Sequence, residues 1–254
     1  MALSWSGRRQ LMYYGVAAIV ALVFVWGVWN SFFNTAPTCF DGKQNGDETG
    51  VDCGGSCALL CQDQARAPTV LWSRAFRTGA SSYTAAAYIE NNNPGAGARA
   101  VQYSFQLFDA NNQLIVERDG TMDLPPVVDI PVIETGINTG TRAVARTLFA
   151  FSAVPVWEKV PQQNYVIPAI TQPQHAADYS SLSATIQNSS LSDAQNITVA
   201  AILYDESGTA RAASKSVITV PKRSNAPVVF TWPFGVDTSG GPIVKAEISI
   251  LPSF

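Results

Sequence analysis

The hydrophobic pattern begins with an unbroken apolar run close to the N-terminus. Residues 11–33 include no charged side chain. A helix of that length spans roughly 34 Å at ~1.5 Å per residue, which exceeds the ~30 Å of a bilayer core. Such a helix also satisfies its own backbone hydrogen bonds in hydrocarbon. The run therefore predicts one transmembrane helix over residues 11–33, after a cytoplasmic N-terminus over residues 1–10.

The flanks of this run indicate its orientation. Arg8 and Arg9 precede it, and basic residues favour the cytoplasmic side of a membrane. We therefore expect a single-pass protein of the cell membrane whose C-terminal ectodomain lies outside. A cleaved signal peptide is the alternative, but its apolar region usually has 7 to 15 residues and ends in small side chains. The longer, aromatic-rich run favours a retained signal anchor.

Beyond residue 67 the pattern changes to short runs rich in Val, Ile, Thr, Phe and Tyr, separated by turn residues. Such runs are typical of the strands of a β-sandwich, so the chain is predicted to be mainly β. Apolar and polar side chains alternate along two of the runs, which indicates one inward face for each strand. The expected inward positions are Val101, Tyr103, Phe105 and Leu107 in the first run, and Ile197, Val199, Ala201 and Leu203 in the second.

The β pattern is repeated along the chain. Residues 88–93 read Tyr-Ile-Glu-Asn-Asn-Asn, and residues 185–190 read Thr-Ile-Gln-Asn-Ser-Ser. Self-similarity at a fixed interval indicates repeated structural units. We therefore expect two tandem sandwiches, over residues 68–160 and 161–254. Their equivalent structural positions are Asn91 with Asn188, and Asp109 with Asp205.

The repeated strands resemble the FxLYD family. Its motif is read here as Phe-Gln-Leu-Phe-Asp over residues 105–109 and as Ala-Ile-Leu-Tyr-Asp over residues 201–205. Each copy departs from the motif at one position, with Phe108 in place of Tyr and Ala201 in place of Phe. The resemblance implies small exported or membrane-anchored sandwiches of the immunoglobulin-like type. It implies no known chemistry, because sandwiches of this kind serve many functions.

Composition and charge exclude several classes of function. Lys and Arg total 16 and Asp and Glu total 19, for a net charge of −3. A nucleic-acid binder needs a basic face, so no nucleic-acid partner is expected. His175 is the one histidine, and the sequence has no nucleophile elbow, zinc-protease motif or phosphate-binding glycine loop. We therefore expect that the protein is not an enzyme, and a hydrolase is a remote alternative.

Four cysteines lie close together after the apolar run, in a juxtamembrane element predicted over residues 34–67. In an exported segment this small we expect two disulfides, and three pairings are open. The spacing lacks the two-residue knuckles of common zinc sites. An oxidising exterior also disfavours an iron–sulfur cluster. The cysteines are Cys39, Cys53, Cys57 and Cys61.

Oxygen-bearing side chains between the first two cysteines raise the hypothesis of a calcium site, because Ca²⁺ prefers oxygen ligands. An EF-hand loop that starts at Asp41 fails at its third position, which is Lys43. The competing interpretation is that these residues form turns by bonding their own backbone. Both interpretations stay open, and calcium is the one cofactor under consideration. The candidate ligands are Asp41, Asn45, Asp47, Thr49 and Asp52.

Residues 39–57 resemble a short Cys-rich element of bacterial surface and exported proteins, of the form C-x-D-G-x-x-N-G-x-E-T-x-x-D-C-G-G-x-C. The resemblance implies a location on an envelope surface, often as a linker, and it implies no activity. In this element a further cysteine commonly follows after two residues. Here three residues, Ala58, Leu59 and Leu60, separate Cys57 from Cys61.

Two sets of sandwich residues invite a functional interpretation. Asp109 and Asp205 are carboxylates, which can act in acid–base chemistry or bind metals. Each stands at the same hairpin of its own copy, so we interpret both as turn formers. Trp72, Trp157 and Trp232 could line a ligand groove, but Trp232 is expected in a sandwich core or at a domain junction.

These observations favour a non-enzymatic surface protein whose sandwiches present loops and edges for binding or envelope assembly. The expected partners are the membrane, through the single anchor, and an extracellular protein or polymer. The alternative from a different class is a calcium-dependent binder of glycan or polymer.

Overall fold

The computed structural model describes residues 5–33, 36–126, 129–160, 168–232 and 234–251. It is mainly β, with one N-terminal apolar helix, two disulfides and several sheets that fit a β-sandwich fold, as the sequence predicts. The chain divides into two compact units, Met1–Cys57 and Ala58–Phe254. We describe each unit by itself.

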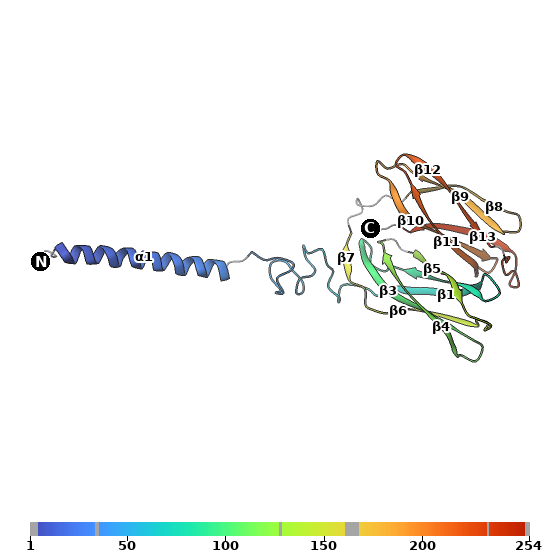
Figure 1. Cartoon of the computed structure of the whole chain (residues 1–254), viewed down its shortest axis with the longest axis horizontal. Helices are drawn as coiled ribbons and strands as arrows, with labels where there is room; N and C mark the ends of the chain where they lie inside the picture. Colours follow the sequence, from blue (N-terminus) through green and yellow to red (C-terminus); the bar gives the residue numbers. More distant parts are fainter. Residues whose placement is uncertain (1–4, 34–35, 127–128, 161–167, 233, 252–254) are drawn as a thin grey trace. The chain divides into compact units, whose positions relative to one another are not determined.

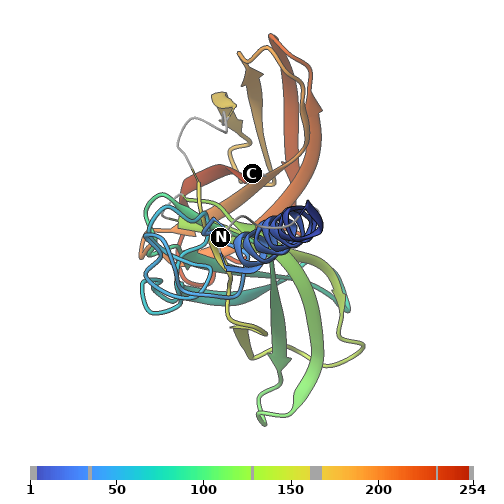
Figure 2. The ribbon, with the colours of Figure 1, turned by 90° about the vertical axis from the view of Figure 1, so that its left-hand side faces the viewer.

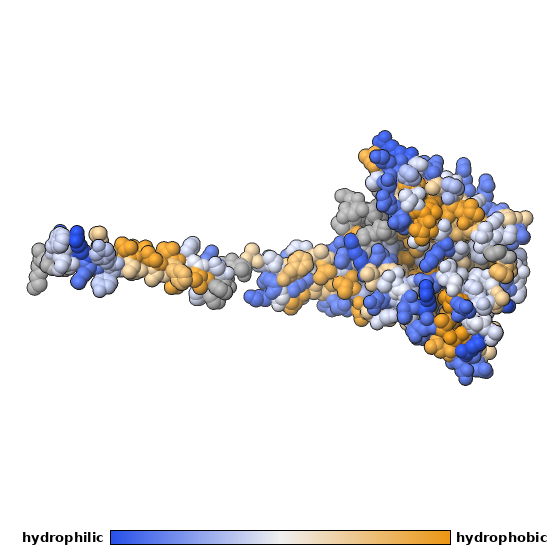
Figure 3. Space-filling model, viewed as in Figure 1, coloured by the Kyte–Doolittle hydropathy of each residue, from blue (hydrophilic) through white to orange (hydrophobic). Residues whose placement is uncertain are grey.

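The first unit contains the only long apolar helix among the described residues, α1, over Trp5–Phe33. Its mean hydropathy of 2.2 and its length suffice to cross a membrane, and both fit either an anchor or a signal sequence. Figure 3 shows the apolar band along this helix. The predicted span over residues 11–33 lies within α1. The predicted cytoplasmic segment, residues 1–10, is helical from Trp5 onward, and residues 1–4 lie outside the described part of the chain.

The second unit begins with a seven-stranded half. Its sheets have the strand orders β1-β2-β5 and β4-β3-β6, and β7 pairs with the start of β3. Figure 1 shows these strands from cyan to yellow. The strands are β1 (Thr69–Arg77), β2 (Ser82–Glu90), β3 (Ala96–Phe108), β4 (Leu114–Leu124), β5 (Asp129–Asn138), β6 (Arg146–Phe151) and β7 (Trp157–Lys159).

The second half of this unit repeats the same arrangement with six strands. Its sheets have the orders β8-β9-β12 and β11-β10-β13, so each strand from β8 to β13 takes the place of its counterpart from β1 to β6. Figures 1 and 2 show the two halves as separate lobes. The strands are β8 (Ala169–His175), β9 (Ser181–Asn188), β10 (Ala194–Asp205), β11 (Ala210–Val220), β12 (Ser224–Thr231) and β13 (Ile243–Leu251).

Each half encloses its own hydrophobic core. All eight side chains predicted to face inward are buried, four in the first core and four in the second. The period-2 pattern of β3 and β10 therefore identified the inner face of both strands. Phe105 and Leu107 anchor the first core, while Leu182, Phe230 and Leu203 are among the large buried side chains of the second.

A third cluster lies where the two halves meet, between the sheets that contain β2 and β10. In β10 the face opposite the core is buried, because Ala200, Ile202 and Tyr204 pack with Ala86 of β2. The corresponding face of β3 differs, since Gln102 is exposed while Ser104 is 7% exposed. The two lobes thus share apolar contact along their facing sheets.

Polar contacts tie the same two lobes together. The Tyr88 hydroxyl of β2 donates a hydrogen bond to Glu247 of β13. The Lys215 ammonium of β11 lies 3.6 Å from a Glu134 carboxylate oxygen of β5. The sequence division into sandwiches over 68–160 and 161–254 stays a prediction, because its boundary adjoins residues 161–167, which lie outside the described residues.

The third cluster predicts how the body unfolds. Ile202→Ala removes a buried side chain from this cluster and should lower the free energy of unfolding by about 2–5 kcal/mol. Val217→Ala, on the neighbouring strand at an exposed position, should change it by less than about 0.5 kcal/mol. Denaturant titration of the full chain in detergent, followed by tryptophan fluorescence and far-ultraviolet circular dichroism, measures both. Separate transitions for the two signals, or equal effects of the two variants, would contradict a shared core.

Candidate functional site

The four cysteines are oxidised. Cys39 pairs with Cys57, with their Cα atoms 5.6 Å apart, and Cys53 and Cys61 are disulfide-bonded as well. The expectation of two disulfides in this element is confirmed. Short polar loops of this kind bury little apolar surface, so covalent links are what holds them in one conformation.

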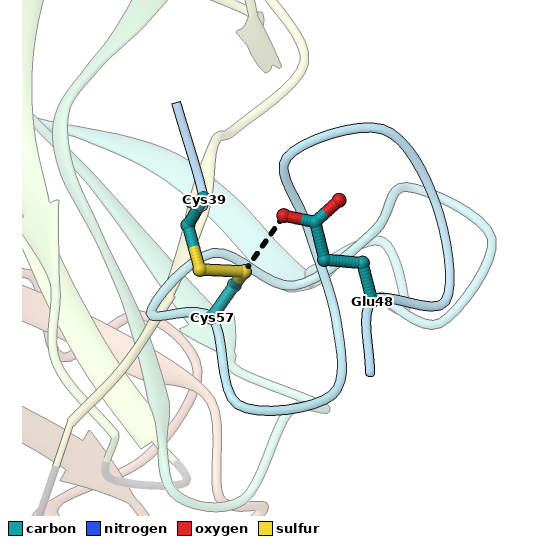
Figure 4. Close-up of side chains that lie close together, drawn as sticks. All are labelled: Cys39, Glu48 and Cys57. Atoms are coloured by element: carbon teal, nitrogen blue, oxygen red, sulfur yellow. Dashed lines mark hydrogen bonds between the residues drawn. A yellow bond between two sulfur atoms is a disulfide. The ribbon is translucent and has the colours of Figure 1, made fainter. Parts of the chain in front are cut away.

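Glu48 lies beside the first of these disulfides. Figure 4 shows its carboxylate directed at the sulfur of Cys57, at 3.3 Å. Cys39, Glu48 and Cys57 together resemble a metal-binding group by distance alone. A disulfide sulfur is not a thiolate, however, so only the carboxylate could act as a ligand. The other Glu48 oxygen accepts hydrogen bonds from the backbone N–H groups of Asn45 and Asp52, which makes Glu48 an organiser of the loop.

The predicted calcium ligands are used in turns. Asp41 accepts hydrogen bonds from the Lys43 N–H and the Asn45 amide, and the Asn45 amide lowers the pKa of the Asp41 carboxyl. Asp52 accepts the Gly42 N–H with both carboxylate oxygens.

The other two predicted ligands also belong to turns. Asp47 accepts the Ser56 hydroxyl, and the Thr49 N–H bonds to the Cys53 carbonyl. Among the described residues, the three aspartates form no convergent carboxylate group. These hydrogen bonds are those expected if the residues form turns. Calcium binding stays a prediction.

The equivalent asparagines occupy the same structural place in both halves. Asn91 follows β2, is buried, and donates to the carbonyls of Ala96 and Pro125. Asn188 ends β9, is buried, and donates to the carbonyls of Ser192 and Pro221. Each asparagine therefore bonds at two places: at or just before the start of the next strand, and just after the hairpin that this strand begins. Unpaired carbonyls at these buried positions would be costly, which explains why both copies use Asn here.

The equivalent aspartates close the corresponding hairpins. Asp109 accepts the N–H groups of Asn111 and Gln113, and its other oxygen lies 2.5 Å from the Arg142 guanidinium. The hydrogen bond from Arg142 lowers the pKa of the Asp109 carboxyl. The neighbours of Asp109 therefore hold it in its charged form as a turn former, as the sequence predicts.

Asp205 closes the equivalent hairpin of the second half and is less exposed to solvent than Asp109. It is 1% exposed and accepts the Ser207 and Thr209 N–H groups. Its second oxygen accepts from the Arg211 guanidinium at 2.6 Å. The Ser207 hydroxyl, then the Thr209 N–H and Arg211, hold the pKa of this carboxyl well below its usual range. Neither aspartate is free to act as an acid–base group while it holds its hairpin.

The predicted tryptophans and histidine have individual environments. Trp157 is buried in the first core and Trp232 in the second. Trp72 stacks on Tyr88 in the third cluster, with ring centroids 5.8 Å apart. His175, at the end of β8, stacks on a neighbouring tyrosine ring and is exposed. Most of these rings pack inside the protein, and Trp232 also borders a cleft.

That cleft has a volume of about 680 Å³ and lies where the two halves meet. One wall is residues 73–78 of β1 and the turn after it, and a second is residues 144–147 at the start of β6. Across from them stand residues 210–212 of β11, with Trp232 and Asp237. The Trp232 indole N–H is buried and has no acceptor among the described residues.

Four arginines line the cleft. Arg77 donates to the carbonyls of Gly79 and Ala80, and Arg146 lies over the Phe108 ring at 4.5 Å. Arg211 is held by Asp205. Among the described residues, Arg74 and Arg146 form no ion pair within 4.0 Å of a carboxylate. The lining arginines are Arg74, Arg77, Arg146 and Arg211.

Sequence reasoning did not find this cluster. Its arginines come from three strands that are far apart in the chain, and none belongs to a basic run. Arg74 follows Trp72 on β1 at the strand period, and Trp72 and Phe76 belong to the third cluster. That placement is a tertiary consequence of how the two halves pack, so no local motif could signal it.

Comparisons with known proteins do not identify the chain. No protein family and no curated protein matches it. A β-glucuronidase from glycoside hydrolase family 2 is 11% identical over 68% of this chain, with a TM-score of 0.19. This chain spans only 24% of that enzyme.

Two further solved structures are equally distant. The tandem CBM22-1-CBM22-2 domain of Paenibacillus barcinonensis Xyn10C is 7% identical over 75% of this chain and 92% of that chain, with a TM-score of 0.18. Lactobacillus farciminis oxalate decarboxylase is 10% identical over 72% of this chain and 86% of that chain, with a TM-score of 0.13. Similarities this low assign neither a fold family nor a function.

The low pKa of Asp205 predicts a pH dependence of stability. A folded pKa below the unfolded value of ~3.9 gives stability that is complete above about pH 5 and is lost as the pH falls further. Asp205→Asn should therefore melt below the wild type at pH 7, and the gap should narrow toward pH 3. Glu206→Gln, an exposed neighbour in the same turn, should leave the curve unchanged. A gap that stays constant with pH would contradict the assignment.

The disulfides predict a local response to reduction. No cysteine follows Cys61, so the strands of the body carry no covalent cross-link of their own. Dithiothreitol should make residues 36–67 sensitive to trypsin while the far-ultraviolet β signal of the full chain persists. Cys39→Ser with Cys57→Ser should reproduce part of this sensitivity without reductant. Collapse of the β signal on reduction would show that the body depends on the disulfides.

Proposed function

We propose that the chain is a single-pass, membrane-anchored surface protein with a non-enzymatic β-sandwich ectodomain that binds an extracellular partner. The observation that carries the proposal is the combination of α1 with oxidised cysteines close behind it. An apolar helix with exposed side chains needs a lipid environment. Disulfides persist in oxidising compartments. Both features fit a protein whose larger part lies outside the membrane.

The charge flanking α1 supports the orientation. Arg8 and Arg9 lie in the N-terminal part of the helix, and its last turn holds no basic residue. Basic residues favour the cytoplasmic side. The N-terminus is therefore cytoplasmic in this proposal, and the segment after residue 34 is outside.

The ectodomain is best explained as a binding module. The equal strand order of the two halves supports the resemblance of both copies to FxLYD domains of the immunoglobulin-like type. Rigid sandwiches present loops and strand edges to partners. The carboxylates that invited a catalytic interpretation, Asp109 and Asp205, are committed to hairpins. Binding of a partner is therefore favoured over hydrolysis. Glycan binding through calcium has less support, because the candidate ligands are bonded within turns.

Membrane topology tests the proposal. Proteinase K added to right-side-out membrane vesicles should remove a C-terminal epitope tag, and inside-out vesicles should protect it. Arg8→Glu with Arg9→Glu should weaken or invert this preference, because the orienting charge is reversed. Arg8→Lys with Arg9→Lys should keep it. A body that appears in the soluble fraction without α1 would instead identify that helix as a cleaved signal peptide.

A further inference from the structure

We propose that the arginine-lined cleft binds an acidic segment of a partner protein in extended conformation, added to the open edge of β1. The inference rests on the proposed binding function and names the chemistry of the partner. It is carried by two features of the cleft, the strand edges in its walls and its excess of positive charge.

The walls of the cleft are strand edges. Side chains of a strand alternate between two faces, so a cavity over one face touches every second residue. This cleft instead touches consecutive residues: all of 73–78 beside β1, 144–147 beside β6 and 210–212 on β11. Contact with consecutive residues is the pattern expected of a cleft that follows a strand edge, where backbone N–H and C=O groups are accessible, and not of a cleft over one face of a sheet.

No described strand pairs with these edges, and a hydrogen bond between two of them runs from the Ser73 hydroxyl of β1 to the Thr147 carbonyl of β6. β1 is the outer strand of the order β1-β2-β5, β6 that of β4-β3-β6, and β11 that of β11-β10-β13. An outer strand leaves one row of backbone donors and acceptors unpaired, and an extended peptide can pair with it as an added strand. β1 offers the longest consecutive run of strand residues in the cleft, residues 73–77. At ~3.3 Å per residue that run pairs with a peptide of roughly 17 Å.

The charge of the cleft selects an acidic peptide. The Asp205 carboxylate offsets Arg211, and Asp237 is the one carboxylate among the lining residues. Arg74, Arg77 and Arg146 remain as positive charges, and the carbonyl partners of Arg77 do not neutralise it. Guanidinium groups bind carboxylates through two parallel hydrogen bonds. Four of the eleven arginines of a chain with a net charge of −3 thus line this one cleft.

The side chains also suit an alternating peptide. An added strand sends its side chains alternately to two sides. Apolar surface from Phe76, Tyr83 and Trp232 lies in the same cleft as the arginines. A peptide that alternates acidic and apolar residues can therefore contact both kinds of surface at once. A polysaccharide could match the charge, but it would leave the row of backbone groups on β1 unused.

A defined peptide tests the proposal. The probe is a fluorescent octapeptide of alternating Glu and Val, titrated with the full chain in nonionic detergent and followed by fluorescence anisotropy. The same peptide with Gln in place of Glu should bind at least about tenfold more weakly, because the charge-assisted bonds are lost. Binding of the Glu peptide should also weaken as NaCl rises from 50 to 500 mM. Equal binding of the Gln and Glu peptides would overturn the role of charge.

Backbone methylation tests the added strand. One peptide carries N-methyl groups on every Glu and another on every Val, and their charge is unchanged. Only alternate residues of an added strand donate to its host. One methylated peptide should therefore bind about tenfold more weakly than the other. Equal affinities would overturn strand addition.

Variants of the protein locate the site. Arg74→Gln with Arg146→Gln should weaken binding of the Glu peptide about tenfold, and both side chains are exposed, so the melting temperature should not change. Arg99→Gln with Arg118→Gln removes the same charge from two exposed arginines outside the cleft and should leave binding unchanged. Equal losses in the two double variants would show a nonspecific charge effect and overturn the site.

Two further binding measurements distinguish an acidic peptide from other anionic ligands. Polygalacturonate that binds in an arginine-dependent way while the Glu peptide does not would overturn the peptide class in favour of an acidic glycan. Displacement of the Glu peptide by inorganic phosphate at equal charge would reduce the cleft to a simple anion site. A failure of the topology test would remove the extracellular setting but leave these binding results intact, so the two proposals fail separately.

Discussion

The contact between the outer faces of two sheets is the constraint on which the rest of the body depends. The second face of a sandwich sheet normally meets water, and its residues are polar for that reason. In β10 the second face carries Ala200, Ile202 and Tyr204, and these pack against β2 and β5 of the first half. Burial of apolar area on both faces of these sheets stabilises the association of the two halves. The hydrogen bond between Tyr88 and Glu247 adds a polar contact between the two halves.

The cleft is a product of the same contact. Residues of β1, β6 and β11 from the two halves line one cavity at this junction. Arg211 lines the cleft, and it is paired with Asp205, which is buried in a hairpin of the second half. Stability of that hairpin and the shape of the cleft are consequently linked. A charged pair buried to this degree needs its hydrogen bonds complete, and the turn N–H groups supply them.

Local features of the chain could be read from the sequence because their causes are local. The apolar run of α1, the alternation of Phe105 and Leu107, and the turn chemistry of Asp109 each depend on neighbours within a few residues. The repeat could be recognised because each half has an asparagine, Asn91 or Asn188, that bonds backbone carbonyls at the equivalent place. The packing of the halves could not, because Ile202 looks the same in sequence whether a partner sheet covers it or not. The arginine cluster depends on that packing and was missed with it.

The equal strand order of the two halves has a consequence for assembly. Neighbouring repeats risk exchange of equivalent strands, which gives misfolded chains and swapped oligomers. Here the inward residues have opposite sizes: the first core contains Phe105 of β3 and the small Ala85 of β2, whereas the second contains Ala201 of β10 and Leu182 of β9. An exchanged β3 would place two bulky side chains in one half and two small ones in the other, so crowding and a void would penalise the error together. The different side-chain volumes of the two copies therefore disfavour exchange of these strands.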